Sequence, residues 1–261
     1  MTVGSGFDDD AWIRRYHQPP AGSPRLVCFP HAGGSASYYF PWSRTLAAEV
    51  EVLALQYPGR QDRMLDESAA TIGELADGAY AALRARGVLD PVDGSPVSLF
   101  GHSMGAIVAF EITRRMQRDG LPAPARVFLS GRRAPDIYRA TTPIHTLDDA
   151  GLVAEMKRVG GTHQDVLDNP DLQQLFLPTI RADYRAIETY RYEPGPPMQG
   201  PVTALTGDGD TAVTPDEAAA WERFTTGPFD LRVFRGGHFY LEEHSADLID
   251  LVRTELTKGR S

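Results

Sequence analysis

A serine flanked by glycines stands at the junction of two structural patterns. The segment Gly101-His102-Ser103-Met104-Gly105 follows the apolar run VSLF (97–100) and precedes a helical pattern over 106–118. A serine on a sharp strand-to-helix turn has a strained backbone and leaves no space for neighbouring Cβ atoms, and the flanking glycines provide that space. The free N–H groups of the following helix favour negative charge that develops beside it. The pattern therefore predicts Ser103 as a nucleophile.

A serine hydroxyl at its ordinary pKa needs a base, and the chain contains seven histidines. His238 follows the apolar run LRVF (231–234), and two glycines before it permit a tight loop from which its ring can reach a central strand. We therefore predict His238 as the base, the alternative being that it only caps the next helix. His102 adjoins the serine and is expected to be structural or a pocket wall, while His31 is expected to orient its own loop by hydrogen bonding.

The acid that should orient the histidine lies in the stretch GDGD after the apolar run VTALT (202–206). Its role is to fix the imidazole tautomer and to stabilise the imidazolium. In hydrolases with the chain order Ser…Asp…His, the acid commonly sits three residues after the turn glycine, which points to Asp210. Asp208 then falls within the turn, where aspartate often bonds its own backbone. We predict Asp210 as the acid and keep Asp208 as the alternative.

An oxyanion hole needs backbone N–H donors close to the nucleophile. The amide of Met104, directly after the serine, is one candidate. The second should come from the glycine-rich turn His31-Ala32-Gly33-Gly34, which follows the apolar run RLVCFP (25–30). We predict Ala32 as that donor, with Gly33 as the second choice and as a substrate contact.

Near-continuous apolar runs of this kind are typical of strands buried on both faces of a parallel sheet. Besides the runs already named, VEVLALQY (50–57) and RVFLS (126–130) show the pattern. A helix-period stripe over 71–86 and the pattern over 106–118 alternate with them. Alternating strands and helices predict an α/β fold with a mostly parallel, doubly wound sheet. With the order Ser…Asp…His, this is the α/β-hydrolase fold.

One interval departs from the alternation, because residues 131–201 carry no convincing strand pattern. Two helical stripes occur there, the second expected to bend near Pro178. We predict a helical lid insertion over 135–195, with Phe176 and Tyr184 among the walls of an acyl pocket; the alternative is a pair of long crossover helices. The whole is expected to form a single domain over 12–258, preceded by a disordered segment at 1–11.

The composition sets limits on partners and location. The chain has 261 residues, 42% of them hydrophobic, and a formal net charge of −9, which disfavours nucleic acid and anionic membranes as partners. It carries one cysteine, Cys28, and no Cys/His cluster with metal-ligand spacing, so neither a disulfide nor a metal is expected. We expect a cytoplasmic monomer without a membrane segment or a cofactor.

The segments FPHAGGSASYYF, QYPGRQDR, LFGHSMGA, FLPTIRADYRAIETYRY and RGGHFYLEEH, in this order, resemble the type II thioesterases. These stand-alone editing hydrolases accompany polyketide synthases and nonribosomal peptide synthetases. The resemblance runs from about Trp12 to the C-terminal helix. It implies hydrolysis of acyl or aminoacyl thioesters on the phosphopantetheine arm of acyl or peptidyl carrier proteins, which clears stalled or misprimed chains.

Docking of an acidic carrier to an acidic protein would require local arginines and apolar contacts. Candidates are Arg60 and Arg63 in the PGRQDR segment, and Arg132 and Arg133 after the run 126–130. The alternative is that these arginines are solvated or structurally paired, with Arg60 buried.

Three other functions use the same fold. A general carboxylesterase or peptidase would cleave simple esters as fast as carrier thioesters. An acyltransferase would pass the acyl group to an alcohol or amine, which product analysis would reveal. A catalytically silent binding protein would not be labelled at Ser103 by a fluorophosphonate.

Overall fold

The computed structural model describes residues 11–91, 93–139, 142–161 and 167–258. Within them a seven-stranded sheet has the order β1-β3-β2-β4-β5-β6-β7. All six predicted strands form and run parallel: β2 (Arg25–Phe29), β3 (Glu51–Leu55), β4 (Val97–His102), β5 (Arg126–Ser130), β6 (Val202–Gly207) and β7 (Phe229–Phe234). The sequence did not predict β1 (Ile13–Arg14), which pairs antiparallel with β3, because two residues carry no periodicity. Of the predicted disordered segment 1–11, all but Ala11 lies outside the described residues.

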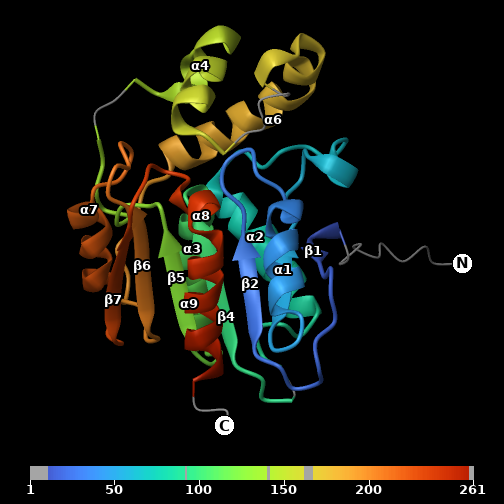
Figure 1. Cartoon of the computed structure of the whole chain (residues 1–261), viewed down its shortest axis with the longest axis vertical. Helices are drawn as coiled ribbons and strands as arrows, with labels where there is room; N and C mark the ends of the chain where they lie inside the picture. Colours follow the sequence, from blue (N-terminus) through green and yellow to red (C-terminus); the bar gives the residue numbers. More distant parts are fainter. Residues whose placement is uncertain (1–10, 92, 140–141, 162–166, 259–261) are drawn as a thin grey trace, which may run out of the picture.

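Helices cover both faces of the sheet, as predicted for a doubly wound arrangement (Figure 1). The helices α2 (Ile72–Ala85) and α3 (Met104–Arg118) pack with the larger buried cluster on one face. The helices α1 (Phe40–Leu46), α8 (Tyr240–Glu243) and α9 (Ser245–Thr257) pack on the other. The strands β2 and β5, which pair with β4 on either side, are almost entirely buried. The described residues also form short helices, namely α7 (Pro215–Ala219) and the 3-10 segments Ala36–Tyr39, Gln61–Arg63, Ile144–Thr146 and Ala220–Phe224.

Two helices between β5 and β6 lie across the end of the sheet at which Ser103 is found (Figure 1). They are α4 (Asp149–Val159) and α6 (Pro170–Thr189). Asn169 caps α6 by accepting hydrogen bonds from the amides of Asp171 and Leu172. A third buried cluster, built around Leu152, Met156, Leu177 and Ile180, joins the two helices. This agrees with the predicted helical insertion, while its limits at 135–195, the domain limits 12–258 and the bend at Pro178 stay predictions.

Candidate active site

Ser103 stands on a strained turn between β4 and α3. Its backbone has φ 54° and ψ −114°, a left-handed conformation that is rare outside glycine. A Cβ at Gly101 would lie 2.1 Å from the carbonyl oxygen of Gly105, and a Cβ at Gly105 would lie 2.0 Å from that of Phe29. This confirms the predicted reason for the flanking glycines, which is that the turn leaves no space for a Cβ atom at either position. The turn is held in place by a 2.8 Å hydrogen bond from the Ser103 amide to the carbonyl of Ser130 on β5.

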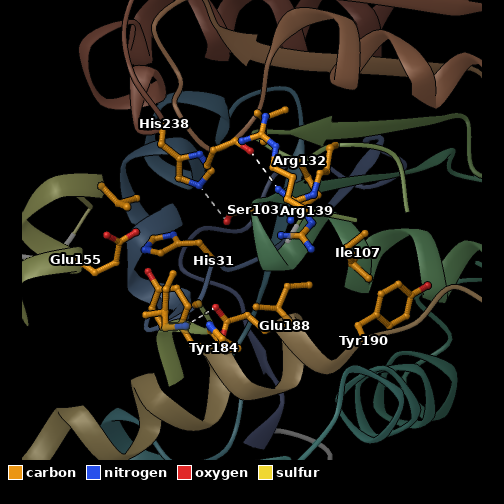
Figure 2. Close-up of a pocket in the computed structure, with 18 of the residues that line it drawn as sticks. His31, Ser103, Ile107, Arg132, Arg139, Glu155, Tyr184, Glu188, Tyr190 and His238 are labelled. Atoms are coloured by element: carbon orange, nitrogen blue, oxygen red, sulfur yellow. Dashed lines mark hydrogen bonds between the residues drawn. The ribbon is translucent and has the colours of Figure 1, made fainter. Parts of the chain in front are cut away.

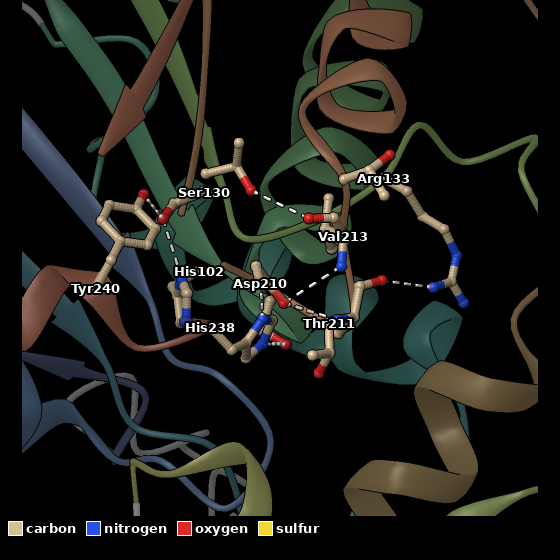
Figure 3. A network of polar contacts seen from close by, with 12 residues as sticks. His102, Ser130, Arg133, Asp210, Thr211, Val213, His238 and Tyr240 are labelled. Carbon is tan, nitrogen blue, oxygen red and sulfur yellow. Dashed lines mark hydrogen bonds and ion pairs between the residues drawn. The ribbon is translucent and has the colours of Figure 1, made fainter. Parts of the chain in front are cut away.

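His238 and Asp210 complete a hydrogen-bonded chain that begins at Ser103; Figure 2 shows the contact between Ser103 and His238, and Figure 3 the contact between His238 and Asp210. The Nε2 atom of His238 lies 3.0 Å from Ser103 Oγ, and its Nδ1 lies 2.7 Å from Asp210 Oδ2. The Asp210 side chain is fully buried and that of His238 is 9% exposed. Because a carboxylate can only accept, Nδ1 carries the proton, which leaves Nε2 free to accept the serine proton.

The GDGD stretch assigns different partners to its two aspartates. The other carboxylate oxygen of Asp210 accepts hydrogen bonds from the amides of Ala212, at 2.7 Å, and Val213, at 3.2 Å (Figure 3). Asp208 instead accepts a 2.9 Å hydrogen bond from the amide of Gly236. The expectation that Asp208 bonds its own turn is thus wrong, because its carboxylate reaches across to the loop that carries His238.

Gly207 explains how these two loops approach so closely. A Cβ at Gly207 would lie 2.4 Å from the carbonyl oxygens of both Gly236 and Gly237. The Gly209 amide donates a 2.8 Å hydrogen bond to the Gly236 carbonyl. The backbone of the acid loop therefore supports the backbone of the histidine loop directly, and Asp208 adds a side-chain contact to that support.

His102 is fully buried behind the catalytic histidine, as the structural interpretation predicted. Its Nδ1 lies 2.9 Å from Ser130 Oγ, which in turn lies 2.6 Å from the Tyr240 hydroxyl (Figure 3). Its ring centroid is 5.0 Å from that of His238. Burial, followed by the charges of His238 and His31, holds the pKa of His102 well below its ordinary value. A neutral ring is thus kept beside His238.

The side chain of His31 makes its contacts outside its own loop, and its predicted role in orienting that loop stays a prediction. Its buried ring packs edge-on against Tyr38, at 5.0 Å between centroids, and against Phe239, at 4.9 Å. The side-chain hydrogen bond it makes runs to the backbone of Gly161 in the insertion, and it raises the pKa. Burial and the charges of His238 and Arg60 outweigh that bond and lower the pKa of His31 to about 3.

The glycine-rich turn has a geometry that favours Ala32 as the oxyanion donor. The Gly34 amide donates to the His31 carbonyl at 2.9 Å, and Gly33 has φ +75° at the position where such a turn requires it. The Gly33 amide donates to Asp183 at 2.8 Å and is thereby occupied. Across the described ranges, no hydrogen bond engages the backbone N–H of Ala32 or of Met104. Gly33 is therefore wrong as the second choice of donor.

Gly33 is not among the residues that line the cavity beside Ser103, so its predicted role as a substrate contact is wrong too, and its Cα faces the insertion. A Cβ there would lie 3.0 Å from the side chain of Ile180 on α6. Phe176, on the same helix, packs in the cluster between α4 and α6 and does not line the cavity beside Ser103, so its prediction is wrong as well. Tyr184 does line that cavity, as predicted (Figure 2).

The predicted docking role is wrong for Arg60 and Arg63, and the structural alternative is correct. Arg60 is buried in an ion pair with Asp183. The guanidinium of Arg63 donates to the Gln56 carbonyl at 3.0 Å and lies over the ring of Trp12, 4.5 Å from its centroid. Neither side chain is free to meet a partner.

Arg132 and Arg133 line the cavity, and their docking role stays a prediction. Arg133 donates to the carbonyls of Ile137, at 3.1 Å, and Ala212, at 3.2 Å. Burial, and then the charge of Arg133, lower the pKa of Arg132 to about 9. Figure 2 shows Arg132 beside Ser103 on the same side of the cavity.

The cavity beside Ser103 has a volume of about 590 Å³, which is the size of many small-molecule sites. Its apolar walls include Ile107, Ile144, Leu147, Met156, Ile180 and Ile187. Arg139, Arg158, Glu155 and Glu188 add charge to it. Arg139 pairs with Glu217 and Arg158 with Glu155, so these charges are compensated within the protein. Glu188 accepts hydrogen bonds from the amides of Ile144, at 2.7 Å, and His145, at 3.1 Å.

Asp183 is the residue of this site whose role the sequence did not predict. It occurs in the segment FLPTIRADYRAIETYRY, which carried the family resemblance, but no function was assigned to it there. The available signal was its position in the apolar stripe of α6, between the buried Ile180 and Ile187. A carboxylate in such a stripe is buried and requires a cationic partner.

The fold and the Ser–His–Asp geometry are those of a serine hydrolase with the α/β-hydrolase fold. A family model described as a thioesterase domain matches residues 24–256. The chain is 48% identical over 254 residues to a probable cadicidin biosynthesis thioesterase of Streptomyces griseus, covering 97% of this chain and 67% of the relative. It is 43% identical over 261 residues to the thioesterase PikA5 of Streptomyces venezuelae, covering all of this chain and 89% of that protein.

Among solved structures, the type II thioesterase BorB from the borrelidin biosynthetic cluster superposes with a TM-score of 0.87 at 47% identity, covering 95% of this chain and 98% of BorB. The chain therefore belongs to the thioesterase family, among the type II thioesterases. In the part of the chain that the structure describes, no helix is long and apolar enough to span a bilayer. The same residues contain no cluster of three or more side chains suited to hold a metal ion.

Proposed function

We propose that this protein is a stand-alone editing thioesterase that removes acyl or aminoacyl groups from the phosphopantetheine arm of acyl or peptidyl carrier proteins. The observation that carries the proposal is the hydrogen-bonded chain from Asp210 through His238 to Ser103 at the edge of a large cavity. The relatives support the biological setting, since one is named for cadicidin biosynthesis and another comes from the borrelidin biosynthetic cluster.

Acylation begins when Ser103 Oγ attacks the thioester carbonyl carbon while its proton passes to His238 Nε2. The negative charge on the carbonyl oxygen is stabilised by the amides of Ala32 and Met104. When the tetrahedral intermediate collapses, the carbon–sulfur bond breaks and His238 returns the proton to the departing sulfur. A thiol with a pKa of about 8.5 is a good leaving group, so this step needs little assistance.

Deacylation repeats the same steps with water as the nucleophile. His238 removes a proton from a water molecule as its oxygen attacks the acyl-serine carbonyl, and the same amides stabilise the oxyanion. The bond to Ser103 Oγ then breaks, the serine regains a proton from His238, and the carboxylic acid leaves. Asp210 keeps the imidazole in the required tautomer throughout, and the cycle needs no cofactor.

One assay series tests the chemistry and the partner together. Acyl groups of different length and branching, and an aminoacyl group, are presented on a carrier protein and as the matching small N-acetylcysteamine thioesters. We expect a higher kcat/KM for carrier-bound substrate, with free acid as the product. Equal rates on simple esters would favour a general carboxylesterase, and acyl transfer to an added alcohol or amine would favour an acyltransferase.

The Ser103→Ala variant supplies the control for the chemical step. We expect it to keep its unfolding temperature within a few degrees, to lose turnover by at least about 10³-fold, and to lose labelling by a fluorophosphonate. Retained turnover in a clean preparation would contradict the role of Ser103. A wild-type protein that the probe fails to label would instead favour the silent binding protein.

A further inference from the structure

A buried ion pair connects the insertion to the body of the protein next to the active site. The Arg60 Nη1 and Nη2 atoms each lie 2.8 Å from a carboxylate oxygen of Asp183, and both side chains are only 5% exposed. Arg60 follows β3, whereas Asp183 lies on α6, 123 residues away. The contact is a two-pronged fork, the geometry in which a guanidinium and a carboxylate fix each other's orientation.

The same two side chains also bind the backbone of the turn that carries Ala32. Asp183 Oδ2 accepts a 2.8 Å hydrogen bond from the Gly33 amide. Arg60 Nη1 donates a 2.9 Å hydrogen bond to the Gly34 carbonyl. A donor and an acceptor of consecutive turn residues are therefore held by opposite ends of one ion pair, and the amide that precedes them in the chain is that of Ala32.

Neighbouring residues of α6 reinforce this arrangement. Thr179 Oγ1 donates a 2.6 Å hydrogen bond to the carbonyl of Gly59, which precedes Arg60. Ile180 packs directly against Gly33. One face of α6 thus contacts the loop after β2 and the loop after β3 at once. Moving this part of the helix would break the ion pair and release the turn.

An ion pair so well excluded from water is a poor device for stability alone. Removing two charges from water costs free energy that their attraction often fails to recover, and apolar side chains of similar volume frequently stabilise a fold as well. What apolar side chains cannot do is bind the Gly33 amide and the Gly34 carbonyl. The particular contribution of this pair is therefore the orientation of the turn.

We propose that Arg60 and Asp183 are positioning residues that hold the Ala32 amide in the oxyanion hole and make α6 a fixed wall of the active site. This inference rests on the proposed roles of Ser103 and Ala32. It implies that loss of the pair weakens binding of the transition state more than binding of the substrate. It also implies that, when the insertion changes shape, the part of α6 around Asp183 stays in place.

Three variants separate the effect of the ion pair on the orientation of the turn from its effect on the stability of the fold. Asp183→Asn keeps the shape but removes the charge, Arg60→Lys keeps the charge but removes the fork, and the double variant Arg60→Met/Asp183→Leu replaces the pair by apolar side chains. With a neutral N-acetylcysteamine thioester, we expect kcat to fall about 10- to 100-fold in all three, somewhat less than for outright loss of an oxyanion donor. We expect KM to change less than about threefold.

The double variant gives the discriminating result. Its unfolding temperature should recover toward the wild-type value, because no unpaired charge remains buried. Its kcat should stay low, because the Gly33 amide and Gly34 carbonyl still lack their partners. A purely structural pair would instead restore kcat together with the unfolding temperature.

The affinity for an inhibitor supplies a second measurement, and it does not depend on the stability of the fold. An alkylboronic acid bonds to the serine oxygen and places an oxygen in the oxyanion hole, so its Ki should rise by the same factor by which kcat/KM falls. A non-hydrolysable thioether analogue of the substrate should bind unchanged. The matched control is Glu255→Gln, which breaks the 2.9 Å ion pair with Arg126 on β5 far from the site and should lower only the unfolding temperature.

The proposal is overturned if folded Arg60→Lys and the double variant keep wild-type kcat and boronic acid affinity. Should Asp183→Asn fail to fold, those two variants decide the matter. Failure of the proposed function would look different, because Ser103→Ala would then retain turnover and boronic acid binding while the wild-type protein showed no preference for carrier-bound substrate.

Discussion

Asp210 and Asp208 differ in what their carboxylates hold, and this difference can be measured. Asp210→Asn preserves the shape but cannot keep the proton on His238 Nδ1, so we expect kcat to fall by about 10³- to 10⁴-fold. Asp208→Asn retains an oxygen that can accept from the Gly236 amide, so kcat should stay within about threefold of the wild-type value. Steady-state hydrolysis by the purified variants tests both. The reverse ranking would show that the acid of the triad has been misassigned.

His31 and His102 are both held neutral, which makes the stability of the fold depend on pH. Burial lowers the pKa of each, to about 3 in the case of His31, whereas the unfolded chain binds a proton near pH 6.5. Between pH 6.5 and pH 3 the unfolded state therefore holds more protons than the folded state, and stability falls as the pH is lowered. The contribution of His31 is fully present above pH 6.5 and is reduced by about 2 kcal/mol at pH 5, and that of His102 falls in the same direction.

Urea unfolding at pH 7.5 and pH 5.0 checks this prediction. The wild-type protein should lose more stability between the two values than His31→Gln, by about 2 kcal/mol, because the variant no longer has that histidine to protonate in its unfolded state. Carboxylates contribute equally to both proteins and cancel in the comparison. An identical loss in the two proteins would mean that His31 titrates alike in the folded and unfolded states.

At the scale of elements, the parts predicted correctly are those with strong local signals. The six parallel strands are apolar runs buried on both faces, and the elbow at Ser103 requires glycines on both sides within five residues. Asp210 and His238 were predicted from their positions just beyond the ends of such strands. In each case the residues that indicate the strand, the turn or the catalytic side chain lie within a few positions of it in the sequence.

The wrong predictions share a physical cause, which is that charge and size do not reveal a partner distant in sequence. Arg60 is a polar residue in a glycine-containing loop and has the character of a surface residue, but Asp183 on α6 buries it. The Gly33 amide is occupied by Asp183, which lies 150 residues further along the chain. Phe176 lies on the helix that lines the cavity, yet it packs against the cluster that joins α4 and α6. These outcomes depend on how the insertion packs, which no local pattern specifies.

At the scale of the whole molecule, the carboxyl edge of the sheet gathers groups from across the chain. The loops after β2, β4, β6 and β7 contribute the oxyanion turn, Ser103, Asp210 and His238, and α6 closes over them (Figure 1). The scaffold beneath is a continuous sheet with helices packed against both faces, so it can hold the strained serine. The surface around this edge would have to recognise the proposed carrier partner.

The net charge of −9 leads to a prediction about that recognition. The carrier partner implied by the family is expected to be acidic, so the two proteins should repel one another at long range, and salt should weaken this repulsion. Raising the NaCl concentration from about 20 mM to about 200 mM shortens the screening length from roughly 20 Å to roughly 7 Å. We expect kcat/KM for a carrier-bound acyl group to rise a few-fold over this range. Hydrolysis of the neutral N-acetylcysteamine thioester of the same acyl group should stay constant and serves as the control. A fall in kcat/KM for the carrier substrate alone would instead reveal a local basic surface whose attraction exceeds the overall repulsion, and substitution of exposed arginines would then locate it.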